Sequence, residues 1–250
     1  MSGVDLTRWQ TEVLRYSTLV REPMDLSNLS LWEPLVGEPP AERSSKPREQ
    51  FFKEEGPYLD GWLTVEARPK RIDWRLGHDS ASPRSILPVI GPYDELHDEF
   101  LQLIRKWPGP DQPVHRLAFG AVLMLPCDSL SEAHTALGRL LPSVTIDPDN
   151  TRDLLYRINR RRRSSALEGR GEINRLSTWS VVEVARIEVD MSSIGEPAKK
   201  DMLESKVCRL ELDVNSAPEF EGPISPDQAE ELTNELFELA SELVSVGDVG

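Results

Sequence analysis

The chain has 250 residues, with 29 Lys and Arg against 43 Asp and Glu, which gives a formal net charge of −14. A content of 38% hydrophobic and 29% charged residues is typical of a folded soluble protein and argues against a disordered or membrane protein. The longest apolar run, residues 117–125, is too short to span a bilayer, and the N-terminal residues lack a signal-peptide pattern. Two cysteines are too few for a disulfide framework or a Cys-based metal site. We therefore expect a cytoplasmic protein.

The first third of the chain predicts strands and one long surface segment. Residues 8–20 alternate β-branched and aromatic side chains, which favours a strand. Residues 34–57 are rich in Pro, Glu, Ser, Lys and Arg, which predicts an excursion over the surface, with partial disorder or a partner-binding arm as options. Two short runs, 59–67 and 71–76, flank Arg68-Pro69-Lys70 and predict a hairpin.

Two helices and a central strand are predicted next. Apolar residues recur at helical spacing from Leu96 to Trp107, and prolines end this helix. Residues 116–125 are apolar on both faces, the pattern of a strand at the centre of a sheet. Ser129 and Glu132 then form a capping box that opens a second helix.

The C-terminal part repeats the order of strands followed by a helix. Residues 154–158, 179–189 and 207–214 are the predicted strands. A proline-containing capping box at residues 225–228 opens an amphipathic helix that Gly247 ends.

Strands grouped ahead of helices favour an α+β fold over regular βαβ alternation. We expect mainly antiparallel sheet or sheets with amphipathic helices packed on one face. One option is two similarly organised halves, residues 1–112 and 113–250, although the sequence has no evident residue-level repeat.

A run of arginines is the first candidate site. Seven arginines and only two acidic residues, Glu168 and Glu172, give residues 157–175 a charge of about +5, in what we expect to be a loop. Guanidinium groups bind phosphate oxygens, so this loop could bind a partner protein or nucleic acid; the alternative is pairing with the protein's own carboxylates. The candidate residues are Arg157, Arg160, Arg161, Arg162, Arg163, Arg170 and Arg175.

The last predicted helix is the second candidate, because residues 227–248 hold seven acidic residues and no Lys or Arg. Such a face is either a solvated surface or a docking surface for a basic partner. The predicted docking residues are Glu231, Glu235, Glu238 and Glu242.

A third, weaker candidate is an acid-base or metal site near Asp73, His78 and Asp79, because a carboxylate can orient an imidazole. The alternative is a purely structural role, in which Asp73 forms an ion pair with an arginine of the sheet. The sequence contains no phosphate-binding loop, dinucleotide fingerprint, nucleophile elbow or His/Cys metal motif. We therefore expect no metal, no cofactor and no catalytic residue.

Four segments resemble a widespread family of uncharacterised bacterial proteins of similar length: RIDW at 71–74, YRINR at 156–160, NRLSTWS at 174–180 and CRLELDVN at 208–215. The resemblance implies a bacterial cytosolic protein and transfers no activity, cofactor or site residue.

Three functional hypotheses follow. The leading one is a non-catalytic binding protein, a subunit of a bacterial complex that contacts another protein through its arginine and acidic surfaces. The second is a nucleic-acid-binding module centred on residues 157–175. The third is a hydrolase or nuclease near Asp73 and His78.

Overall fold

The computed structural model describes residues 8–27, 29–79, 86–110, 112–167, 170–189 and 200–248, with the backbone only at 186–189 and 200–203. Its strands are β1 (Gln10–Val20), β2 (Glu42–Lys46), β3 (Phe51–Tyr58), β4 (Gly61–Arg68), β5 (Arg71–Gly77), β6 (Val114–Cys127), β7 (Leu155–Asn159), β8 (Arg162–Arg163), β9 (Glu172–Val189) and β10 (Lys200–Ser216). Its helices are α1 (Glu33–Val36), the 3-10 turn Pro47–Glu49, α2 (Tyr93–Arg105), α3 (Leu130–Leu140) and α4 (Pro226–Val246).

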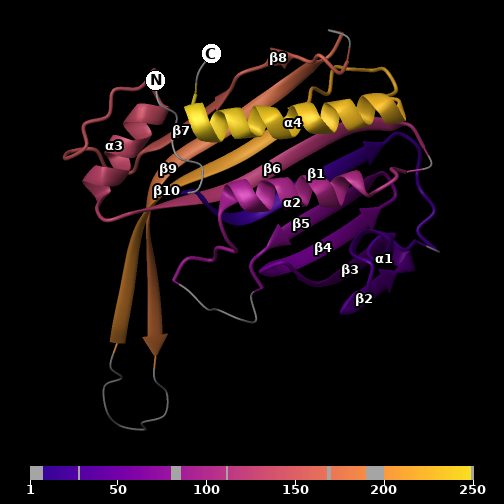
Figure 1. Cartoon of the computed structure of the whole chain (residues 1–250), viewed down its shortest axis with the longest axis horizontal. Coiled ribbons are helices and arrows are strands. Elements are labelled where there is room, and N and C mark those ends of the chain that lie inside the picture. The colour runs from indigo at the N-terminus through magenta and orange to yellow at the C-terminus, as the bar shows by residue number, and fades with distance from the viewer. Residues whose placement is uncertain are drawn as a thin grey trace.

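All the described strands belong to one antiparallel sheet, which confirms the α+β class (Figure 1). The strand order is β2-β3-β4-β5-β1-β6-β10-β9-β7, with β8 paired to β9. The strand predicted at the centre, β6, lies next to the middle strand β1. Residues 121–125 of β6 are all buried, because helices cover one face and Met124 packs with Leu87 and Val207 on the other.

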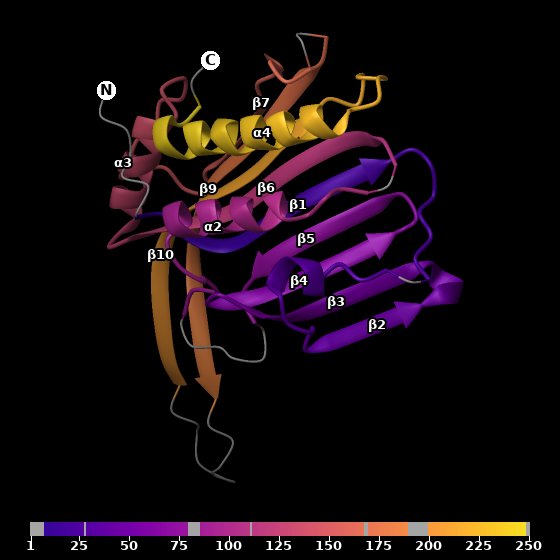
Figure 2. The same ribbon diagram turned by 45° about the vertical axis from the view of Figure 1, so that its right-hand side comes forward.

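Helices α2 and α4 lie side by side over the same face of the sheet (Figures 1 and 2). The ring of Phe237 in α4 stacks on Phe119 of β6, with the ring centroids 4.0 Å apart. His97 of α2 is nearly buried beside the same Phe237, and its Nε2 lies 3.0 Å from the hydroxyl of Ser241. This histidine is therefore part of the packing between the two helices.

The helix boundaries follow the predicted caps. The Ser225 side chain accepts a hydrogen bond from the Gln228 backbone N–H, and the Gln228 side chain accepts one from the Ser225 N–H, which completes the predicted box. Ser129 caps α3 in the same way at Glu132. The Glu132 carboxylate, in contrast, accepts from the N–H of Asp128 rather than that of Ser129.

Residues 34–57 differ from the predicted irregular excursion. They contain β2 and β3, which extend the sheet to its outer edge. The sequence pattern missed these strands because the inward residue Glu54 is charged. Its carboxylate is fully buried, where it accepts hydrogen bonds from the N–H groups of Leu31 and Trp32 and pairs with Arg43.

Residues 157–175 also differ from the predicted loop. Nine of its nineteen residues lie in strands: β7 runs through Asn159, β8 is a two-residue strand, and β9 begins at Glu172. Pairing to β9 holds β7 and β8 in place, so polar side chains do not prevent strand formation there.

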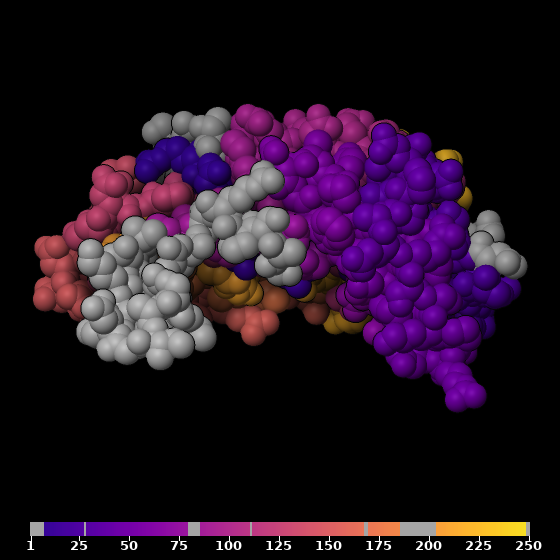
Figure 3. All heavy atoms as spheres, turned by 90° about the horizontal axis from the view of Figure 1, so that it is seen from below, coloured from indigo at the N-terminus to yellow at the C-terminus, as the bar shows by residue number. Residues whose placement is uncertain are grey.

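The sheet continues across the predicted boundary between residues 112 and 113, because β1 pairs with β6 over most of its length. Seen from below, atoms coloured indigo and purple fill the right-hand part of the molecule, and a smaller indigo patch lies at the upper left beside atoms coloured pink (Figure 3).

Candidate functional site

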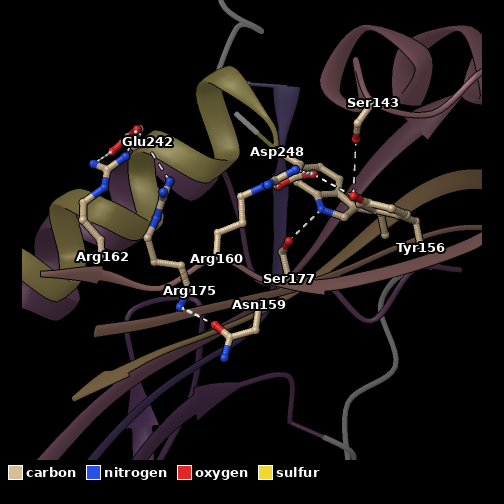
Figure 4. A network of polar contacts seen from close by, with 10 residues as sticks. Ser143, Tyr156, Asn159, Arg160, Arg162, Arg175, Ser177, Glu242 and Asp248 are labelled. Atoms are coloured by element: carbon tan, nitrogen blue, oxygen red, sulfur yellow. Dashed lines mark hydrogen bonds and ion pairs between the residues drawn. The ribbon is translucent and has the colours of Figure 1, made fainter. Parts of the chain in front are cut away.

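The arginines of β7–β9 face carboxylates at the end of α4 (Figure 4). Arg162 makes two hydrogen bonds to Glu242, with N–O distances of 2.7 and 3.0 Å. Arg160 binds Asp248 through Nε and Nη2, at 2.5 and 3.0 Å. We call these four residues, together with Arg175, the arginine–carboxylate clamp.

Arg175 is the buried cation of the clamp, with a relative exposure of 2%. Its Nη2 lies 3.5 Å from Oε1 of Glu242, and burial lowers the pKa of its guanidinium below the ordinary arginine value. A buried cation needs a counter-charge, so Glu242 stabilises both Arg162 and Arg175.

Asp248 is the second carboxylate of the clamp. Burial opposes its ionisation, but hydrogen bonds from Arg160 and Tyr156 outweigh that effect and hold its pKa below the ordinary value. The Tyr156 hydroxyl donates to Oδ2 of Asp248 at 2.8 Å. The Asp248 carboxylate therefore connects the segment just after α4 to Tyr156 in β7 and to Arg160, which directly follows β7.

Glu235 makes a further contact between α4 and the arginine segment. Its carboxylate accepts from the Ser164 hydroxyl at 2.7 Å and from the backbone N–H groups of Ser165 and Ala166. Of the four predicted docking residues, Glu235 and Glu242 thus bind the chain itself. Glu231 and Glu238 remain exposed on the outer side of the helix.

Most of the predicted arginines are paired within the molecule, as in the alternative that the sequence left open. Besides the clamp, Arg161 binds Glu219 at 2.9 Å and Glu172 at 3.4 Å. Arg157 and Arg163 are exposed and make no ion pair within the described ranges. Glu168 lies outside the described residues.

A small hollow of about 350 Å³ adjoins Arg163 and Arg170. Two carboxylates, Glu172 and Glu219, line the same hollow. An anion in this hollow would therefore meet two guanidinium groups that attract it and two carboxylates that repel it.

Asp73 and His78 do not form an acid-base pair. The Asp73 carboxylate accepts from Ser17, which lies directly opposite on β1, and from Arg71 at 2.8 Å. His78 follows the end of β5, roughly 16 Å farther along an extended chain. Among the described residues, no group of three or more His, Cys, Asp or Glu side chains is placed to hold a metal ion.

A cavity of about 810 Å³ is a feature that sequence reasoning missed. It lies between residues 104–110 and 112–114, at and after the end of α2, and residues 223–233 at the start of α4. Its wall includes Trp107 and the buried Tyr16, whose hydroxyl lies 2.7 Å from the Thr233 hydroxyl. Burial raises the pKa of Tyr16 to about 12, so its phenol is neutral at physiological pH.

Prolines and carboxylates determine which hydrogen-bonding groups line this cavity. Pro108, Pro110, Pro113, Pro223 and Pro226 line it and carry no N–H group. Asp227 and Glu230 add exposed carboxylates, and the one arginine of the lining, Arg105, already donates to Asn234 at 2.7 Å. The cavity therefore presents more hydrogen-bond acceptors than free donors.

The far ends of β9 and β10 form a two-stranded ribbon, residues 184–189 and 200–205. β10 pairs with β6 up to Lys206, which lies opposite Glu183 of β9, and the last bond of β9 to the β7 side runs from the Val181 N–H to the Leu154 carbonyl. Beyond Glu183 and Lys206 the two strands pair only with each other. The ribbon projects from the body of the molecule in both views (Figures 1 and 2).

Comparison with known proteins adds no assignment: the chain matches no protein-family model and no curated protein. Within the part of the chain that the structure describes, no helix is both long and apolar enough to cross a membrane.

Proposed function

We propose that this protein is a non-catalytic binding protein that serves as a subunit of a bacterial cytosolic complex, and that the β9–β10 ribbon contacts its protein partner. The projecting ribbon is the observation that supports this function. A two-stranded hairpin is only marginally stable in water by itself, because it lacks a packed face. A partner surface would supply that packing.

The base of the ribbon packs against the body of the molecule, so the ribbon is held in position to contact a partner. Val182 and Val184 pack against the small cluster of Leu87, Met124 and Val207, on the face of the sheet away from α2 and α4. The strands beyond this anchor lack a third strand, so their outer edges can accept hydrogen bonds from a partner strand.

The experiment shortens the ribbon without disturbing its root. Val184 and Ser205 are directly opposite in the register, so replacing residues 185–204 by Asn-Gly closes a two-residue hairpin turn and retains Val184 in its packing. Full-length and shortened chains are used for affinity capture from native cells with nuclease present, and each captured partner is then purified and titrated against both chains. We expect the shortened chain to fold and to lose the partner.

The control for this experiment is the full-length chain with Glu231→Gln and Glu238→Gln, which alters exposed charge but leaves the ribbon intact. It should keep the partner. Full binding by the shortened chain would contradict the proposed role of the ribbon, and absence of any protein partner would contradict the complex-subunit function.

For the nucleic-acid alternative, few guanidinium groups of the arginine segment remain free to bind phosphate, because the clamp and the pair between Arg161 and Glu219 occupy most of them. We expect no measurable affinity for duplex DNA or single-stranded RNA at an ionic strength of about 0.15 M. Steeply salt-dependent binding that is lost in the Arg157→Ala, Arg163→Ala double variant would favour this alternative instead.

The cavity favours a second candidate function, the binding of a small molecule. Its volume falls within the range of roughly 300 to 1,000 Å³ that is usual for ligand sites. The acceptor-rich lining and the aromatic wall suit an amine attached to an apolar body, because a cation gains from both carboxylates and an indole face.

Matched probes test this candidate. Tryptamine should raise the unfolding temperature, while indole-3-acetate, which has the same ring and a carboxylate, should not. The tryptamine shift should disappear in Trp107→Ala and persist in Trp62→Ala, since Trp62 lies outside the cavity. Equal shifts with both probes, or none with either, would exclude an amine site.

A further inference from the structure

The two cysteines of the chain meet on adjacent strands. The Sγ atoms of Cys127 and Cys208 are 3.9 Å apart. In the pairing of β6 with β10, Cys208 is opposite Leu125 and Cys127 is opposite Lys206, so the two thiols are diagonal neighbours on one face of the sheet. Residues 81 positions apart in the sequence are thus placed for direct sulfur chemistry.

Their surroundings give the two thiols different properties. Cys208 is fully buried, and its Sγ lies 3.2 Å from the carbonyl oxygen of Ala133 in α3. Cys127 is partly exposed at the end of β6. A hydrogen bond from Cys208 lowers the pKa of Cys127, whereas the same contact and burial raise the pKa of Cys208. Cys127 is therefore the thiol that ionises more readily and meets solvent first.

We propose that Cys127 and Cys208 form a reversible intramolecular disulfide when the protein meets hydrogen peroxide. Cys127 acts as the attacking thiol and Cys208 as the resolving thiol. The chemistry is independent of the proposed binding function.

The reaction balances in two steps. The Cys127 thiolate attacks one oxygen of the peroxide, the O–O bond breaks, and the released hydroxide takes up the proton lost by the thiol to give water. The Cys208 sulfur then displaces the hydroxyl group of the Cys127 sulfenic acid. The leaving hydroxide takes the Cys208 proton and departs as a second water. The two electrons lost by the thiols reduce one peroxide to two waters.

The geometry predicts a bond that forms but is readily reduced. A disulfide brings its sulfur atoms to about 2.05 Å, so the two Sγ atoms must approach by roughly 2 Å. A diagonal pair has a longer backbone separation than a directly opposed pair, and a strained disulfide is easier to reduce. Such a bond would persist under oxidation and be lost again when cellular thiols recover.

The crosslink would lie at the root of the ribbon. Lys206, opposite Cys127, is the position where the β10–β6 pairing ends and the ribbon begins. A covalent bond here would tie the ends of β6 and β10 together. We expect oxidised protein to exchange the backbone amide protons of residues 204–207 more slowly than reduced protein.

The test treats the reduced, folded, full-length protein with one equivalent of hydrogen peroxide, blocks remaining thiols with N-ethylmaleimide after unfolding, and measures the intact mass. We expect a monomer lighter by two hydrogen atoms, with no maleimide added, and a single crosslinked peptide containing Cys127 and Cys208. Dithiothreitol should restore two maleimide-reactive thiols.

The two serine variants form a matched pair. In Cys208→Ser, the hydroxyl can still donate to the Ala133 carbonyl, and dimedone should trap a sulfenic acid on Cys127. In Cys127→Ser, Cys208 should stay reduced under the same treatment. Sulfenic acid in the wild type at the level found in Cys208→Ser would overturn the proposal, as would disulfide-linked dimers instead of the internal bond.

Discussion

At the scale of single residues, Asp248 shows how one carboxylate fixes the end of a helix. Gly247 ends α4 with a positive φ of 81°, and a Cβ at this position would overlap the backbone carbonyl of Leu140. The turn brings the Asp248 N–H to within 2.8 Å of that same carbonyl oxygen. Its side chain then binds Arg160 and Tyr156. Backbone and side chain thus connect α4 to both α3 and β7.

Asp248→Asn should therefore have a pH-dependent effect on stability. Because the pKa of Asp248 is lowered in the folded protein, its ionised form stabilises the fold above the unfolded pKa of about 4, and this contribution is lost as pH falls through the lower folded pKa. We expect the variant to be less stable by about 1 to 2 kcal/mol at pH 7. The difference from wild type should shrink below about pH 4.

Urea unfolding at a series of pH values measures this difference. Glu238→Gln, an exposed carboxylate on α4, is the control and should show no comparable change with pH. A constant difference between Asp248→Asn and wild type across the acidic range would refute the assigned role.

At the scale of elements, α4 is attached to the sheet in two chemically different ways. Its inner side packs Leu236, Phe237 and Leu243 into the core. Its flank presents Glu235 to the turn after β8, and Glu242 to Arg162 and Arg175. Hydrophobic packing positions the helix over the sheet, and the carboxylates fix its position relative to β8 and β9.

A double-mutant cycle tests the charged attachment. Glu242→Gln should destabilise the fold by about 2 kcal/mol, because it leaves the buried Arg175 without its counter-charge. Adding Arg175→Met should recover most of that loss, since an apolar side chain of similar length needs no partner. The free energies of unfolding of the wild type, both single variants and the double variant give the coupling. Additive losses would contradict the pairing.

The periodic elements could be predicted from the sequence, whereas contacts between distant segments could not. Apolar spacing located α2 and α4, and alternation located β5, because each of these elements buries one face against the core. β-Branched and aromatic residues in rough alternation located β1, which lies in the middle of the sheet and buries residues on both faces. β3 was missed because its inward Glu54 is satisfied by Arg43 and by two backbone N–H groups more than 20 residues away.

The candidate sites show the same difference between local sequence patterns, which could be predicted, and contacts between distant residues, which could not. Both charged segments were evident in the sequence, but their mutual pairing joins residues about 80 positions apart and leaves no local pattern. The cavity is built from three separate segments, and its prolines at 108–113 had indicated only the end of a helix. The thiol pair likewise depends on the register of β6 against β10.

At the scale of the whole molecule, one sheet unites the two segments 1–112 and 113–250. β1 lies between β5 from the first segment and β6 from the second, and Trp9 packs edge-on against Trp179 with centroids 6.4 Å apart. Separating the segments would therefore expose an unpaired edge and an apolar face at β6.

We expect the described body of the protein to unfold in one cooperative transition. Tryptophan fluorescence and far-ultraviolet circular dichroism should give the same midpoint in urea, because the tryptophans lie in strands and loops of both segments. Residues 1–112 and 113–250, produced separately, should each lack near-ultraviolet dichroism. Two resolved transitions, or a folded separate segment, would instead support autonomous halves.

The position of α4 in the chain also matters while the protein is being made. The helix follows every described strand, yet it covers β6 and β10, which are synthesised before it. Until residues 226–246 leave the ribosome, the nascent sheet lacks this cover and exposes apolar side chains to solvent. The core beneath α4 is therefore completed only after residues 226–246 have been synthesised.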